Sequence, residues 1–233
     1  MAVQSLSTRT GWLKGIALAF PIVLGYLPVG FAYGVLADKA GLSTLNTVLM
    51  SVIVFAGSAQ LIGVGLLAAG APALSIIVTT FIVNLRHLLM SAAISPYLKR
   101  WKKSELAAFS FELTDETFAV HAAQFALVPP EQSTVFATNL TAQVSWVTGS
   151  WLGAVAGGLI TDVEPFGLDY ALVAMFIALL VVQLKDRLLV GVAVLAGLLS
   201  VVFLFVGFNQ WNVIAATLLA ATAGTVVELW TRK

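Results

Sequence analysis

The chain has 233 residues and a net charge of +1; 60% of its residues are hydrophobic and only 10% are charged. A soluble domain of average composition carries roughly 25% charged residues, so a mean hydropathy of +0.99 excludes an ordinary water-soluble fold and indicates a polytopic membrane protein. The lack of cysteine argues against disulfides and thiolate metal sites, and the lack of a basic domain argues against nucleic-acid binding.

About 20 apolar residues cross the hydrocarbon core of a bilayer, and on this measure the sequence predicts seven membrane-spanning helices. They occupy Trp12–Leu36, Ser43–Ala69, Pro72–Leu98, Ser133–Ile160, Leu168–Leu184, Leu188–Phe208 and Trp211–Leu229. We therefore expect an all-α helix bundle that forms a single transmembrane domain over residues 1–233.

The first two spans contain residues that interrupt helices. Pro21 and Pro28 lie inside the first span, and proline removes a backbone donor and clashes with the preceding turn. The second span carries the small residues of Phe55–Gln60 near its middle. These small residues indicate either close helix packing or a discontinuous helix that lines a substrate site.

The third span holds Arg86, which is the only charged residue between Ala40 and Leu98. An arginine at the bilayer centre costs about 2.5–3.5 kcal/mol on insertion scales, so such residues usually have a function. A polar stripe with helical spacing accompanies it: Thr80, Asn84, His87, Ser91 and Ser95. The stripe indicates either hydrogen bonds between helices or a polar path through the bundle.

Two chemical roles are open for each of the two central residues of this span. Arg86 can bind a substrate carboxylate through two hydrogen bonds, or it can be the fixed partner of an acid within the protein. His87 can carry a proton, because its ordinary pKa of about 6.5 lies near working pH, or it can be a neutral ring that bonds a carbonyl.

The segment of residues 99–132 differs from the spans, because it begins with the basic cluster Lys99–Lys103 and continues as an amphipathic, acidic stretch. We expect it to be cytoplasmic or re-entrant. In one continuous helix, Glu105, Glu112 and Glu116 share a face, as in a helix that lies on the membrane surface. In the alternative, Asp115 or Glu116 turns into the bundle, pairs with Arg86 and takes part in proton coupling.

The distribution of basic residues predicts the orientation. The clusters Lys99–Lys103, Lys185 with Arg187, and Arg232 with Lys233 fall on one side if the segment 99–132 does not cross. Seven spans then place the N-terminus outside and the C-terminus in the cytoplasm. If Ser104–Phe125 crosses, there are eight spans and the N-terminus is cytoplasmic.

The fourth span offers Asn139 and Gln143, which lie four residues apart on one face and can bind a substrate or bond neighbouring helices. A short internal similarity relates Val83–His87 to Val182–Arg187, and Gly30 and Gly34 to Gly149 and Gly153. This pattern is consistent with two related three-span repeats, as in many secondary transporters.

No enzyme signature is present: the sequence lacks a phosphate-binding glycine loop with lysine, an HExxH motif and a GxSxG motif. We therefore expect no catalytic residues, no metal and no cofactor. Without an ATP-binding motif, active transport would draw on an ion gradient or on a partner.

Four motifs stand in order along the chain: Gly25–Gly34, Phe55–Gln60, Asn84–Leu89 and Leu113–Ala119. Together they resemble the large subunit of the two-component branched-chain amino-acid exporters, the AzlC/BrnF type, over nearly the whole length. The resemblance implies export of valine, leucine, isoleucine and methionine across the bacterial cytoplasmic (inner) membrane. It also implies energy from the proton motive force and a small hydrophobic membrane subunit of the AzlD/BrnE type.

These observations lead to one expected site. The expected substrate-binding residues are Gly57, Ser58, Gln60, Asn84, Arg86, Asn139 and Gln143, and the expected proton-coupling residues are His87, Asp115 and Glu116. Two other functions are open from the sequence, a passive channel for small neutral solutes and a membrane scaffold that transports nothing. An intramembrane enzyme is a more distant alternative.

Overall fold

The computed structural model describes residues 2–160, 186–207 and 212–231, together with positions 165, 167, 170, 173, 174, 177, 180, 181 and 184. Its regular elements are all helices, and the described residues contain no strand. The all-α membrane bundle predicted from the sequence is therefore confirmed. The chain forms two compact units, residues 1–172 and 173–233.

The helices of the first unit are α1 (Ala2–Lys39), α2 (Thr44–Ile53), α3 (Gly57–Ala68), α4 (Ala73–Ile94), the short 3-10 helix η1 (Ser95–Tyr97), α5 (Lys103–Phe111), α6 (Asp115–Phe125) and α7 (Gln132–Gly157). The second unit includes helices α9 (Arg187–Val206) and α10 (Asn212–Thr231). The predicted span Leu168–Leu184 lies largely outside the described residues.

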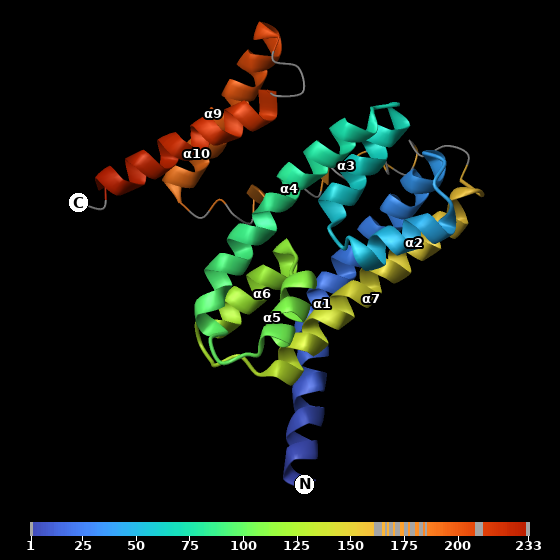
Figure 1. Cartoon of the computed structure of the whole chain (residues 1–233), viewed down its shortest axis with the longest axis vertical. Coiled ribbons are helices and arrows are strands. Elements are labelled where there is room, and N and C mark those ends of the chain that lie inside the picture. The colour runs from blue at the N-terminus through green and yellow to red at the C-terminus, as the bar shows by residue number, and fades with distance from the viewer. Residues whose placement is uncertain are drawn as a thin grey trace. The chain divides into compact units, whose positions relative to one another are not determined.

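Helices α1 and α7 pack along each other and form the centre of the first unit (Figure 1). A Cβ atom built on Gly30 would lie 2.9 Å from the Trp146 carbonyl oxygen, and one built on Gly149 would lie 2.6 Å from the Leu27 carbonyl oxygen. Glycines at such positions let two membrane helices approach closely. The glycines that the sequence relates as repeats thus face each other in this pair.

Alanine at Gly153 is expected to destabilise the α1–α7 pair, because its Cβ would overlap the Phe31 carbonyl oxygen. Overpacking of this kind typically costs about 1–3 kcal/mol, so the midpoint of thermal unfolding in detergent should fall. Gly158→Ala is the matched control, because a Cβ at Gly158 meets no atom within 4 Å. Equal midpoints for the two variants would contradict this packing.

The first two spans differ in how regular they are. The expectation that the first span is interrupted is wrong, since α1 continues through both Pro21 and Pro28. Membrane helices tolerate proline where neighbouring helices and local adjustments satisfy the freed backbone groups, and α1 lies against α7. The break in the second span is confirmed: α2 ends at Ile53, and α3 begins at Gly57.

The α2–α3 break contains a strained residue. Phe55 has a φ of +41° and is the only non-glycine residue with positive φ in the described part of the chain. The left-handed region costs an L-residue roughly 1–2 kcal/mol. The Phe55 ring is 3% exposed and packs edge-on against Tyr26, which holds the break in place.

The segment of residues 99–132 is a pair of short helices, so the interpretation of one continuous helix with Glu105, Glu112 and Glu116 on one face is wrong. Glu112 caps the C-terminus of α5. Thr114 caps the N-terminus of α6, because its hydroxyl accepts a hydrogen bond from the Thr117 amide. The Thr117 hydroxyl oxygen in turn accepts a hydrogen bond from the Thr114 amide at 2.8 Å. This reciprocal cap starts a new helix.

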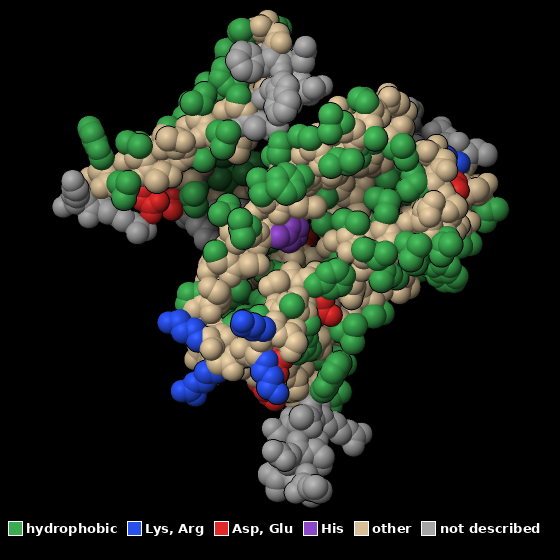
Figure 2. Space-filling model, viewed as in Figure 1, with side chains coloured by type: hydrophobic (Ala, Val, Ile, Leu, Met, Phe, Trp, Pro, Cys, Tyr) green, Lys and Arg blue, Asp and Glu red, His purple; other side chains and the backbone are tan. Residues whose placement is uncertain are grey.

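The surface of the first unit fits a membrane. Among the described residues, three helical segments are long and apolar enough to cross a bilayer: Thr10–Lys39 and Ala73–Tyr97 in the first unit, and Arg187–Val206 in the second. Figure 2 shows lysine and arginine side chains gathered at one end of the first unit. Exposed basic residues lie between η1 and the first residue of α5: Lys99, Arg100, Lys102 and Lys103. The apolar side chains lie along the flanks, as expected for helices that face lipid.

In the second unit, helices α9 and α10 pack against each other. Ala216 and Ala220 are buried in this unit, and Gly224 faces Val192 of α9. These small residues recur every four positions on α10, so one face of this helix packs closely on α9.

Candidate functional site

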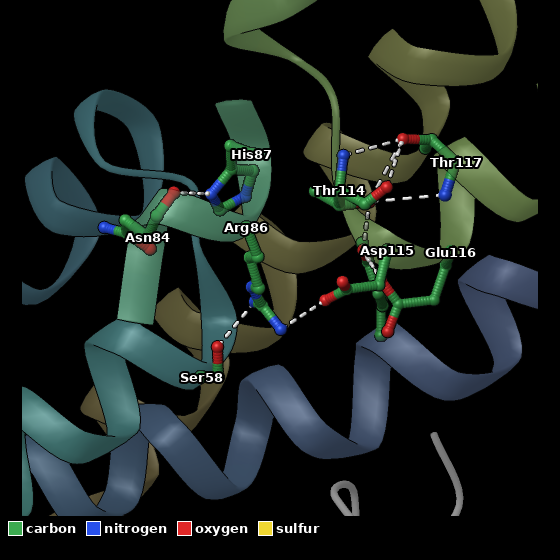
Figure 3. A network of polar contacts seen from close by, with 9 residues as sticks. Ser58, Asn84, Arg86, His87, Thr114, Asp115, Glu116 and Thr117 are labelled. Atoms are coloured by element: carbon green, nitrogen blue, oxygen red, sulfur yellow. Dashed lines mark hydrogen bonds and ion pairs between the residues drawn. The ribbon is translucent and has the colours of Figure 1, made fainter. Parts of the chain in front are cut away.

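Arg86 lies where α3, α4 and α6 meet (Figure 3). Its Nη1 atom forms an ion pair with Asp115 Oδ2 at 2.6 Å, and its Nη2 atom donates a hydrogen bond to Ser58 Oγ at 2.5 Å. The Arg86 and Asp115 side chains are 26% and 21% exposed, so the pair is only partly covered by the described residues. Of the two arrangements predicted for the acidic segment, the structure has the one in which Asp115 turns into the bundle.

The N-terminus of α3 adds to the positive potential around Arg86. Ala56 caps α3 without a side-chain hydrogen bond, and Gly57 and Ser58 form its first turn. A helix N-terminus carries roughly half a positive charge, and here it adjoins a guanidinium group. Two positive groups side by side require an anion, which the Asp115 carboxylate supplies in this structure.

A second carboxylate lies next to Asp115 on α6. Glu116 Oε2 accepts a hydrogen bond from the Tyr26 hydroxyl of α1 at 2.6 Å. The same hydroxyl lies 2.7 Å from Thr114 Oγ1, the cap of α6. Tyr26 thereby connects α1 to the helix end that carries both acids. The Glu116 carboxylate is therefore paired with a neutral hydroxyl, whereas the Asp115 carboxylate is paired with the cationic guanidinium of Arg86.

Helix α4 presents one unpaired donor and one unpaired acceptor within a single turn. Arg86 Nε and Asn84 Oδ1 are both buried, and neither has a hydrogen-bond partner among the described residues. The His87 ring is not a hydrogen-bond partner of either atom; its Nδ1 bonds the Asn84 backbone carbonyl at 3.2 Å. Buried polar atoms are nearly always paired, so these two atoms indicate a place for a ligand or water.

A cavity of about 300 Å³ lies between α2, α3 and α4. Asn84 and Thr80 of the predicted polar stripe line it, together with Gln60 and otherwise apolar side chains. Ser95, at the far end of the stripe, is exposed and donates to the Ala92 carbonyl of α4. The polar stripe therefore lines the cavity at Thr80 and Asn84 and lies on the surface at Ser95.

Gln60 belongs to a buried network that fixes the broken helix against α7. Its Oε1 accepts from Trp146 Nε1 and its Nε2 donates to Ser51 Oγ, each at 3.0 Å. Ser51 in turn donates to Ser150 Oγ at 2.7 Å. The network joins both halves of the broken span to α7, so it holds the N-terminus of α3 at its position beside Arg86.

The two amide residues of α7 have protein partners. Gln143 donates to the Val52 carbonyl at 3.3 Å, near the end of α2. Asn139 Oδ1 lies 2.6 Å from His121 Nε2, and its Nδ2 is buried without a hydrogen-bond partner among the described residues, as is Glu112 Oε2. Asn139 thus belongs to a second polar cluster, which it forms with His121 and Glu112.

Sequence reasoning missed Tyr26, Ser51 and Trp146 as members of the site's framework. Tyr26 lies inside the motif Gly25–Gly34, which could have pointed to it. Aromatic and serine residues are common in membrane helices, however, and their spacing does not reveal that they converge on one break. Only the packing of α1, α2, α3 and α7 brings them together.

Comparison with known proteins identifies the family of this chain. The model of the AzlC protein family matches residues 21–160, which is more than half of the chain. The chain belongs to the AzlC family. The matched residues include all of the Arg86, Asp115 and Glu116 contacts described above.

Several relatives of this AzlC-family protein are membrane proteins by name. It is 34% identical over 230 residues to an uncharacterized membrane protein of Archaeoglobus fulgidus, covering 98% of this chain and 99% of the relative. It is 33% identical to the inner membrane protein YgaZ of Escherichia coli K12, covering 83% and 82%. It is 28% identical to the branched-chain amino acid transport protein AzlC of Bacillus subtilis 168, covering 72% and 66%. No solved structure matches the chain.

These relatives and the apolar helices establish this AzlC-family chain as a membrane protein. Family membership, with one relative named as an amino-acid transport protein, supports a transport role.

Proposed function

We propose that this protein is a secondary active exporter of neutral, hydrophobic amino acids in the bacterial cytoplasmic membrane, which it crosses several times. Valine, leucine, isoleucine and methionine are the proposed substrates, and the proton motive force is the proposed energy source. The name of the Bacillus subtilis relative supports the substrate class. The observation that carries the proposal is the Arg86–Asp115 ion pair.

The ion pair has the same charge pattern as the head group of an amino acid. A substrate carboxylate can replace Asp115 on the guanidinium of Arg86, where two parallel hydrogen bonds are available. The substrate ammonium can then bind the Asp115 carboxylate that was released, with Asn84 Oδ1 as a further acceptor. Substrate binding thus exchanges one internal ion pair for two pairs with the substrate.

Competition at the acids provides the proton coupling. Asp115 binds an ammonium group only when it is ionised, so a proton and a substrate exclude each other there. Acidification on the outer side then releases the substrate, and substrate binding on the inner side releases the proton, which is the order of steps for antiport. Glu116, bonded to Tyr26, and His87, the neighbour of Arg86, are the other proposed proton carriers.

The remaining predicted residues are proposed to shape the site. Gly57 and Ser58 place the N-terminus of α3 beside the carboxylate position. Gln60 fixes that position through Trp146 and Ser51. Asn139 and Gln143 hold α7 against α6 and α2.

The proposed partner is a small hydrophobic membrane subunit. The resemblance to two-component exporters supports this proposal, because in that family the large subunit acts with a small one. The partner would complete the transporter by covering part of the exposed apolar helix faces, which are too extensive for water but suit lipid or another membrane helix.

Leucine accumulation in everted vesicles tests the proposed function. The vesicles come from cells that produce the full chain with the small subunit, and an acid interior imitates the outer side. A pH difference of one unit is worth about 1.4 kcal/mol per proton, which supports accumulation of about tenfold for one exchanged proton. An ionophore that collapses the pH difference should abolish the accumulation.

The two alternative functions give different results in this assay. A passive channel would equilibrate leucine across the vesicle membrane without accumulation, at a rate unaffected by the ionophore. A scaffold would give vesicles with the intact two-subunit complex and no leucine movement above that of vesicles without the chain. Either result would contradict the exporter.

A further inference from the structure

We propose that the cavity between α2, α3 and α4 holds the apolar side chain of the transported amino acid, and that Gly63 sets the size of side chain it accepts. This inference rests on the proposed function, since it places the rest of the substrate whose head group meets Arg86. It adds a specificity-determining residue that the predicted site did not contain.

The cavity begins where the head-group site ends. Ser58 accepts a hydrogen bond from Arg86, and the next two residues of α3, Ala59 and Gln60, line the cavity. On the opposite wall Asn84 lies in the cavity lining with its buried, unpaired Oδ1. An amino acid with its carboxylate at Arg86 and its ammonium bound by Asp115 and Asn84 Oδ1 would direct its side chain into this space.

The lining selects aliphatic side chains. Most of it is apolar: Leu42, Met50, Val54, Val64, Leu67 and Ile76. The polar groups of Gln60 and Thr80 are already bonded, because the Thr80 hydroxyl donates to the Ile76 carbonyl at 2.7 Å and the Gln60 amide bonds Trp146 and Ser51. A polar or charged substrate side chain would lose its water without a new partner, which is costly.

The volume fits a small occupant. About 300 Å³ is at the lower end of the range for ligand pockets in proteins, roughly 300–1,000 Å³. A branched aliphatic side chain fits in such a cavity. A larger side chain on one of the lining residues would reduce the available volume appreciably.

Gly63 is the position where the wall can be thickened most simply. It lies buried on α3, and a Cβ built there would stand 3.7 Å from Thr80 Cγ2, at ordinary contact distance. Alanine is therefore accommodated without displacing a neighbour. Valine extends further into the space between α3 and α4, where the substrate side chain would lie.

The test compares leucine and valine transport by Gly63 variants in the everted vesicles. Because one methylene in a hydrophobic pocket is worth about 10–200-fold in discrimination, Gly63→Val should raise the KM for leucine about tenfold and that for the shorter valine by less than about twofold. Gly63→Ala should shift the ratio of the two KM values in the same direction by a smaller factor.

Gly65→Val and Gly65→Ala are the matched controls. Gly65 lies on the same helix, is exposed, and a Cβ there meets no atom within 4 Å. The Gly65 variants should therefore keep the wild-type ratio of KM values. Immunoblots of the vesicles measure how much of each variant reaches the membrane, and Gly63→Ala carries the comparison if Gly63→Val is poorly inserted.

Two failures can be told apart. If wild-type vesicles accumulate leucine but the ratio of KM values is the same for the Gly63 and Gly65 variants, the cavity is not the side-chain subsite and this inference is overturned. If wild-type vesicles accumulate no amino acid at all, the proposed function is wrong, and this inference falls with it.

Discussion

Replacing Arg86 with alanine is expected to lower amino-acid transport at least about 100-fold. A hydrogen bond to a charged group contributes about 1.5–3 kcal/mol, and two such bonds to the substrate carboxylate would be lost. A free-energy loss of roughly 3 kcal/mol corresponds to about a 100-fold lower rate at limiting substrate. Initial rates of leucine uptake into everted vesicles, normalised to the amount of protein in the membrane, measure the effect.

A double variant separates a substrate role of Arg86 from a purely internal one. Arg86→Ala leaves Asp115 without its cationic partner, which destabilises the protein whether or not the arginine binds substrate. Arg86→Ala combined with Asp115→Asn removes both charges and should restore the amount of protein in the membrane. If Arg86 binds the substrate carboxylate, the double variant also loses the exchange of labelled for unlabelled leucine, which Asp115→Asn alone is expected to keep. Recovery of transport in the double variant would show that the pair is structural.

Two further variants sharpen the comparison. Arg86→Lys keeps the charge but loses the planar pair of donors, so it should retain only a small part of the activity. Arg100→Ala removes an exposed arginine outside the site, between η1 and α5, and should transport leucine at the wild-type rate. An Arg86→Lys variant with full activity would contradict binding of the carboxylate through two parallel hydrogen bonds.

The sequence could predict the position of the site because a charge in an apolar span is costly. Arg86 is the only charged residue among the 59 residues from Ala40 to Leu98, and that isolation marks α4 without any structure. The break at Phe55–Gln60 could also be predicted, since small residues in mid-span permit an interruption. Both features are local, and local composition is sufficient to find them.

The partner of Arg86 could not be selected from the sequence. Asp115 and Glu116 are both candidates, because the sequence does not show where the acidic segment changes direction. The reciprocal cap between Thr114 and Thr117 begins a new helix at Asp115, which changes the direction of every later side chain. Thr114 and Thr117 have the three-residue spacing of a capping box, but a capping box normally has glutamate or glutamine at the second position, so the sequence does not predict this helix start.

The contacts that the sequence did not predict are set by packing between segments that are distant in the chain. α1 was expected to be interrupted at its prolines, yet it continues along α7, where glycines of both helices meet. The sequence does not predict that the amide of Gln60 bonds Trp146, a residue 86 positions away. Neither contact has a counterpart in the local sequence, because helix packing is set by surfaces that meet only in the folded bundle.

Neutralising Asp115 is expected to separate substrate movement from proton movement. In Asp115→Asn the amide oxygen can still accept a hydrogen bond from the substrate ammonium, but the side chain can no longer bind a proton. Accumulation of leucine driven by a pH difference of one unit should fall from about tenfold to none. Exchange of labelled for unlabelled leucine, which moves no net protons, should continue with reduced affinity.

The neighbouring acids show whether this effect belongs to Asp115. Glu105→Gln is the matched control, because glutamine also suits its capping position on α5, and this variant should accumulate leucine like the wild type. Glu116→Gln preserves an acceptor for the Tyr26 hydroxyl, so loss of accumulation in that variant would assign proton binding to Glu116 as well. If Asp115→Asn and Glu116→Gln both accumulate leucine in response to the pH difference, then neither acid carries the proton. Coupling would in that case have to pass through His87, the remaining titratable residue beside Arg86 on α4.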